Sequence, residues 1–128
     1  MSSPNISSQP LVILYVEDNA YVRDSVAELL ANPTRQFVCV GDRTSALEVL
    51  CAGRVDLLLT DVNLPDGSGL DLVREGLQRH PSMPVIVCSS HDLSSATDLL
   101  GPNVHVMRKP FELDELEALV DRLAVQHP

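Results

Sequence analysis

The sequence is poor in aromatic and in basic residues, and both shortages narrow the possible functions. Aromatic residues make up 3% of the 128 residues, and tryptophan is absent. The core must therefore be aliphatic, built from Val, Leu, Ile and Ala. Lys and Arg number 9 against 18 Asp and Glu, which gives a formal net charge of −9. Surfaces that bind nucleic acid or an anionic membrane need basic residues, so neither partner is expected.

Paired cysteines and long apolar runs are also missing. The three cysteines, Cys39, Cys51 and Cys88, form no CxxC pair, and the histidines are scattered, so neither a disulfide framework nor a zinc site is expected. No apolar run approaches the roughly 20 residues that span a bilayer. The first ten residues lack the apolar stretch of a signal peptide. We therefore expect a cytoplasmic protein.

Short apolar runs alternate with helical patterns along the chain. A polar tail, residues 1–10, is expected to be disordered, and a single domain follows over 11–125. The expected strands cover residues 11–16, 36–41, 55–60, 83–89 and 104–107. The expected helices cover residues 19–31, 42–53, 69–80, 92–100 and 112–125. Two helices have clear apolar positions: Val22, Val26, Leu29 and Leu30 share one face of the first, and Leu70, Val73 and Leu77 point inward from the third.

This alternation predicts an α/β fold with a parallel sheet covered by helices on both faces. Right-handed crossovers limit the possible strand orders. At this size they favour a flavodoxin-like, doubly wound (βα)5 sheet with strand order 2-1-3-4-5.

Polar side chains follow four of the apolar runs, where the strands of such a sheet end. Glu17 and Asp18 follow the first run, Asp61 the third, Ser89 the fourth and Lys109 the fifth. The carboxyl ends of parallel strands meet at one edge, which is where ligands bind. Each residue alone could be an ordinary cap, turn or surface residue. Their joint placement at four strand ends is much harder to obtain from capping.

Crowded carboxylates at one edge call for a cation, because they repel one another when all are ionised. Mg²⁺ (or Mn²⁺) suits such oxygen ligands, which would come from Glu17, Asp18, Asp61 and the Asn63 backbone carbonyl. Asp61 could then attack phosphorus as a nucleophile. The Lys109 ammonium and the Ser89 hydroxyl could contact the oxygens of the transferred group.

Four segments together resemble the receiver domain of two-component response regulators. They are "VEDN" (16–19), "LLLTDVNLPDGSG" (57–69), "VIVCSS" (85–90) and "RKPF" (108–111), and the resemblance runs from about residue 11 to residue 125. It implies that Asp61 accepts a phosphoryl group from a phosphohistidine on a sensor histidine kinase or a histidine phosphotransfer protein. It also implies that such a partner docks near Val22, Pro110 and Phe111, and that the Lys109–Pro110 bond is cis.

Two departures from the family's pattern fall on the region that usually transmits the signal. The family often has an aromatic residue three positions before the lysine, where this chain has Val106 with His105 beside it. The helix expected over 92–100 is short and rich in serine. We therefore hypothesise that Ser89, Val106 and His105 act in a switch that repacks this helix rather than rotating an aromatic ring.

Two other functions stay open. A phosphatase of the haloacid-dehalogenase-like group would need an acid at position 63, where this chain has asparagine, and a cap domain that does not fit this length. A pseudo-receiver that binds partners without phosphorylation would lack an acid, the aspartate or the lysine, and none is lost. We expect the phosphorylated state to be recognised by a downstream protein partner or by an output domain. The sequence does not separate a stand-alone regulator from a piece of a hybrid kinase.

Overall fold

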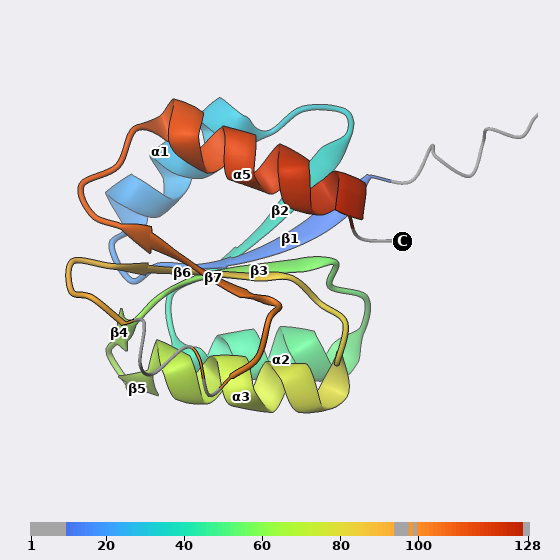
Figure 1. The fold of residues 1–128 in the computed structure, drawn as a ribbon, viewed down its shortest axis with the longest axis vertical. Coiled ribbons are helices and arrows are strands. Elements are labelled where there is room, and N and C mark those ends of the chain that lie inside the picture. The colour runs from blue at the N-terminus through green and yellow to red at the C-terminus, as the bar shows by residue number, and fades with distance from the viewer. Residues whose placement is uncertain (1–9, 94–97, 99, 127–128) are drawn as a thin grey trace, which may run out of the picture.

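In the part of the chain that the structure describes, a five-stranded parallel sheet lies between two pairs of helices (Figure 1). The structure, a computed structural model, describes residues 10–93, 98 and 100–126. The sheet strands are β1 (Leu11–Val16), β2 (Arg35–Val40), β3 (Leu57–Asp61), β6 (Val85–Ser89) and β7 (Val104–Arg108). One face is covered by α1 (Ala20–Leu30) and α5 (Leu113–Gln126), and the other by α2 (Arg43–Ala52) and α3 (Gly69–Arg79).

The strand order is β2-β1-β3-β6-β7, which confirms the predicted 2-1-3-4-5 order of the five sheet strands. A small antiparallel hairpin, β4 (Asn63–Leu64) with β5 (Gly67–Ser68), follows β3 and was not predicted. The helix expected over 92–100 lies largely outside the described residues. None of the described helices is both long and apolar enough to cross a bilayer.

Strand alternation divides the aliphatic core into two layers. Ile13 and Tyr15 of β1 pack on the α1 and α5 side, whereas Leu14 and Val16 pack on the α2 and α3 side. The three central strands are almost wholly buried, as expected for a parallel sheet covered on both faces. This alternation also fixes the face on which the residue after each strand emerges.

The predicted apolar face of the first helix is only partly buried. Val26 and Leu30 are in the core, but Leu29 is 63% exposed and Val22 39% exposed. The four residues were predicted to share one helical face, and of these only Val26 and Leu30, an i, i+4 pair, are buried against the sheet. In α3, Val73 is buried as predicted, and Leu72 is a buried residue that the sequence pattern missed.

A buried arginine ties three elements together at the amino-terminal edge of the sheet. Arg35, the first residue of β2, is 5% exposed. Its Nε donates to the Leu30 carbonyl at the end of α1 at 2.6 Å. Its guanidinium also forms ion pairs with Glu117 and Asp121 of α5. The charge is therefore paired on two sides, as a buried cation requires.

Candidate functional site

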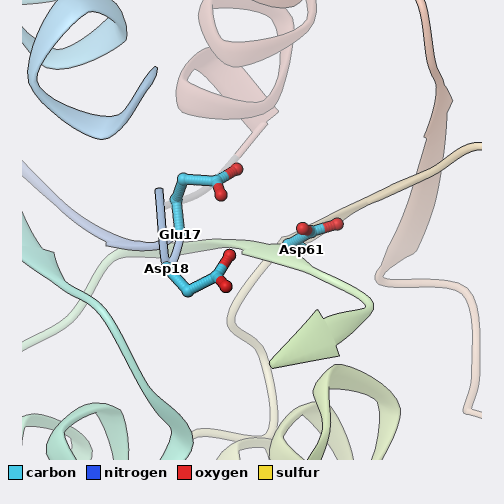
Figure 2. A group of neighbouring side chains, drawn as sticks. All are labelled: Glu17, Asp18 and Asp61. Atoms are coloured by element: carbon cyan, nitrogen blue, oxygen red, sulfur yellow. The ribbon is translucent and has the colours of Figure 1, made fainter. Parts of the chain in front are cut away.

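Three carboxylates meet at the carboxyl edge of the sheet, where β1 and β3 end side by side. Glu17 and Asp18 follow β1, and Asp61 is the last residue of β3. Each offers a carboxylate oxygen, and the three oxygens lie within 4.8 Å of one another. Figure 2 shows the side chains gathered over the strand ends. The proximity of this acidic cluster (Glu17, Asp18 and Asp61), predicted from the strand ends, is confirmed.

Backbone and side-chain hydrogen bonds hold Glu17 in place. Its N–H donates to the Val40 carbonyl at 3.1 Å, which continues the β1–β2 pairing by one residue. The Asn19 N–H donates to its carboxylate at 3.0 Å, and Arg23 Nη1 donates to its carbonyl at 2.9 Å. Asn19 also caps α1, accepting from the Val22 N–H. The end of β1 and the start of α1 are thus fixed to each other through Glu17.

Asp61 sits where β3 turns away from the sheet. The next N–H, that of Val62, donates both to the Cys88 carbonyl at 3.1 Å and to the Asp61 Oδ1 at 3.0 Å. Gly69 then packs directly against this backbone: a Cβ there would stand 2.1 Å from the Asp61 carbonyl oxygen. Only glycine allows the chain to return so close to the strand end.

Lys109 reaches Asp61 from the far side of the site. Its N–H donates to the Ser89 carbonyl at 2.8 Å, so the β6–β7 pairing sets its position. Its Nζ lies 3.0 Å from the Asp61 Oδ1. The Lys109–Pro110 peptide bond is cis, as the resemblance predicted.

The acidic cluster opens into a cavity of about 760 Å³ on the α1 and α5 side of the sheet. Strand alternation explains the face, because Tyr15 and Cys88 pack in the core cluster on that side. The described residues that line the cavity are Tyr15, Glu17, Asp18, Asn19, Val22, Val26, Asp61, Cys88, Ser90, Lys109, Pro110 and Phe111. The three predicted docking residues therefore adjoin the acidic cluster.

The three residues of the predicted switch, Ser89, His105 and Val106, are not among the described residues that line the cavity. Ser90, but not Ser89, is among the described residues that line the cavity. Ser89 is 1% exposed, and its Oγ accepts the His91 N–H at 3.0 Å. Alternation turns Ser89 to the opposite face from Cys88. In β7, His105 and Val106 are both half-buried and point to opposite faces.

The electrostatics of the site reflect three acids facing one ammonium group. Burial raises the pKa of Glu17, and the charge of Asp61 adds to this. Burial alone would lower the pKa of Lys109, but its hydrogen bond to Asp61 and the charges of Asp61 and Glu17 raise it. Three carboxylates face a single ammonium group, and the donors of the cluster are all oxygen. Hard divalent cations such as Mg²⁺ and Mn²⁺ fit this donor set.

Sequence reasoning missed several residues that shape the site. Arg23 and Asn19 hold Glu17, and Tyr15 and Cys88 line the cavity. Burial raises the pKa of the Cys88 thiol to about 12, so this thiol stays protonated at neutral pH. The alternation of faces along a strand could have found Tyr15, which lies two residues before Glu17. It could not have found Cys88 from Ser89, which points to the opposite face of the same strand. Nothing in the sequence indicated the bond from Arg23.

The sequence matches the response regulator receiver domain family over residues 13–121. It is 32% identical over 118 residues to the DNA-binding transcriptional regulator NtrC of Escherichia coli strain K12, covering 91% of this chain and 25% of NtrC. It is 35% identical over 109 residues to the response regulator protein PilR of Pseudomonas aeruginosa, covering 84% of this chain and 24% of PilR. The chain thus spans about a quarter of the length of these relatives.

Solved structures show the same fold. The signal receiver domain of an HD domain-containing protein from Pseudomonas fluorescens Pf-5 has a TM-score of 0.83 at 22% identity, covering 99% of this chain and 95% of that chain. The chemotaxis response regulator CheY4 of Vibrio cholerae has a TM-score of 0.80 at 20% identity, covering 90% of this chain and 99% of that chain. The family match over most of the sequence, together with this fold, shows that the chain belongs to the receiver domains of two-component response regulators, which are signalling domains.

Proposed function

We propose that Asp61 accepts a phosphoryl group from a phosphohistidine of a sensor histidine kinase or a histidine phosphotransfer protein. The observation that carries this proposal is the acidic cluster with Lys109 Nζ 3.0 Å from the Asp61 Oδ1. A pseudo-receiver would lack one of these groups. The unit that performs the transfer comprises residues 11–125, preceded by the polar tail 1–10, and it acts in the cytoplasm.

The site residues divide the work of the transfer. An Asp61 oxygen attacks phosphorus, so that a new P–O bond forms while the P–N bond to histidine breaks and its electron pair leaves with the imidazole. Lys109 contacts one phosphoryl oxygen, and it is already held beside the nucleophile. The Ser89 hydroxyl donates to a second, because its bond from His91 uses only an acceptor position.

Mg²⁺ (or Mn²⁺) would be held by Glu17, Asp18, Asp61 and the backbone carbonyl of Asn63. Bound there, the cation supplies positive charge for the phosphoryl oxygens in the transition state. The three carboxylates are ready for this role because their oxygens already lie together at the strand ends. Lys109 reduces their mutual repulsion without occupying all of their oxygens.

The partner docks on α1 and on the segment that follows Lys109. Val22, Pro110 and Phe111 line the cavity next to the acidic cluster. Among the described residues, the exposed large hydrophobic side chains lie on α1: Tyr21, Val22 and Leu29. An apolar helix surface beside a phosphoacceptor suits a helical phosphodonor protein, which must bring its histidine within bonding distance of Asp61.

The phosphorylated state is read through the other face of the sheet. Alternation places Ser89 and Val106 on the α2 and α3 side, where a shift of the Ser89 hydroxyl toward the phosphoryl group would change the packing. We propose that the helix expected over 92–100, which lies largely outside the described residues, then repacks. His105 lies on the opposite face of β7 from Val106, toward α5. A downstream protein partner or an output domain recognises the change.

Intact-protein mass spectrometry tests this function. The wild-type chain, Asp61→Asn and the surface control Asp71→Asn are incubated with an acyl phosphate and Mg²⁺. The wild type and Asp71→Asn gain one phosphoryl group, and Asp61→Asn gains none. Release of phosphate over many turnovers would indicate a phosphatase instead. No gain in any variant, with a phosphohistidine protein as donor as well, would indicate a pseudo-receiver.

A further inference from the structure

The hairpin after β3 is tied to a helix that is distant in sequence. Asp66 lies in the turn between β4 and β5, and its carboxylate reaches the start of α2. One oxygen accepts the Arg43 N–H at 2.7 Å. The other accepts the Thr44 N–H at 3.0 Å and the Thr44 hydroxyl at 2.8 Å. Asp66 thus satisfies two of the backbone donors that the first turn of a helix leaves unpaired.

Asp66 is a second carboxylate at a helix start that already has its own cap. Asp42, the N-cap of α2, accepts the Ser45 N–H at 2.7 Å. Asp42 belongs to the chain entering the helix, so its bond stabilises α2 alone. Asp66 comes from a different element, so its bonds fix the hairpin relative to α2. The hydrogen bonds from Arg43 and Thr44 lower the pKa of Asp66 to about 2, so these bonds persist in acid where an ordinary aspartate would be protonated.

The side chain of Arg43, in α2, makes a second contact with the hairpin. The Arg43 guanidinium pairs with Glu75 of α3. On the way, its Cδ passes 3.0 Å from the place where a Cβ on Gly67 would stand. Gly67 has a φ of +152°, a conformation that favours glycine. The hairpin therefore lies against the Arg43 side chain that joins α2 to α3.

These ties matter because the hairpin carries Asn63, and its strands have only two residues each. Such a hairpin cannot hold its own position in water. Asn63 pairs with Ser68, and the turn residue Asp66 lies between them. Resting on the proposed function, in which the Asn63 carbonyl is the neutral ligand of the cation, we infer that Asp66 is a positioning residue that fixes this carbonyl for metal binding.

Metal binding in the absence of phosphorylation tests the inference. Free Mn²⁺ is measured by electron paramagnetic resonance during titration of the full chain. Asp66→Ala is expected to weaken Mn²⁺ binding by about tenfold, the lower end of what loss of a supporting group costs a metal site. Asp42→Ala is the matched control, because it removes one carboxylate and one cap from the same helix start. It should weaken binding by less than twofold.

The outcomes separate this inference from the proposed function. Equal weakening in the two variants, or unchanged binding in Asp66→Ala, would overturn the positioning role, since either result reduces Asp66 to a helix cap or a remote charge. Asp66→Asn keeps one acceptor oxygen and is expected to weaken binding less than Asp66→Ala does; it carries the test if the alanine variant fails to fold. No Mn²⁺ binding by the wild-type chain would overturn the proposed metal site itself and this inference with it.

Discussion

Replacing Gly69 by alanine should disturb the site through the backbone of the phosphoacceptor strand. The added Cβ would stand 2.1 Å from the Asp61 carbonyl oxygen, 3.0 Å from the Val62 Cα and 3.1 Å from the Asp61 carbonyl carbon. All three are backbone atoms, so no side chain can rotate away. The oxygen must retreat to at least 3.0 Å, which displaces the end of β3.

The cost follows from the contact. Overpacking a tight site costs about 1–3 kcal/mol, and here the neighbours cannot yield, so we expect the upper end of that range. A displacement approaching 1 Å at a reacting group costs on the order of a hundredfold in rate. Urea denaturation should therefore show Gly69→Ala to be less stable by about 3 kcal/mol. Its phosphorylation by an acyl phosphate at saturating Mg²⁺ should be roughly a hundredfold slower.

Two other glycines provide graded controls. A Cβ at Gly53 would meet nothing within 4 Å, so Gly53→Ala should be neutral or more stable by about 0.4–1 kcal/mol. At Gly76, in α3, a Cβ would lie 3.3 Å from the Leu50 Cδ1, the end of a side chain that can give way. The gain in helix propensity, about 1 kcal/mol, should offset that contact. If Gly69→Ala were as stable and as fast as Gly53→Ala, the backbone argument would be wrong.

Three further variants probe charges in the site and in the core. Lys109→Met should slow phosphorylation about 10²- to 10³-fold, the typical cost of removing one donor to the transition state. The same change should not weaken Mn²⁺ binding, which the Mn²⁺ titration measures separately from the rate. Because burial raises the pKa of Glu17 above its ordinary 4.5, the folded chain binds this proton more tightly than the unfolded chain does, so stability falls as the pH rises from 4.5 through the raised value. Glu17→Gln should therefore be more stable than the wild type at pH 7 without Mg²⁺, and urea titrations should show this difference in stability shrinking towards pH 4. A difference that does not change with pH would contradict the raised pKa of Glu17. In the same assay Arg35→Met should lose about 1–3 kcal/mol of unfolding free energy, because the buried Leu30 carbonyl loses its donor. The exposed ion pair of Arg74 with Asp71 should contribute less than about 1 kcal/mol. Equal losses on removing the two interactions would refute the role of burial.

The fold and the acidic cluster could be predicted because the apolar residues of helices and of strands recur with different periods along the sequence. Apolar runs separated by helical patterns predict a parallel sheet, and right-handed crossovers favour its strand order. The carboxyl ends of parallel strands then bring Glu17, Asp61 and Lys109 to one edge. The apolar positions predicted on α1 did not specify which of them are buried, since a pattern of apolar residues does not say how wide a stripe meets the sheet. Leu29 is exposed for that reason.

The hairpin and its ties could not be predicted from local pattern. Two-residue strands have no period to detect, and the turn chemistry of Pro65 and Asp66 predicts only a turn. The bonds from Asp66 to Arg43 and Thr44 depend on the packing of α2 beside the hairpin, which is a tertiary property. Ser89 was correctly expected at a strand end, but its parity, opposite to that of Cys88, was not used to predict its face.

The identity of the acceptor residue is the most direct test of the account. An acyl phosphate on aspartate is reduced by borohydride to homoserine, which marks the acceptor permanently. After incubation with Mg²⁺ and a phosphohistidine protein, reduction and peptide mass mapping should place homoserine at position 61. Homoserine at another acidic position, or none despite phosphoryl transfer, would contradict Asp61 as the acceptor.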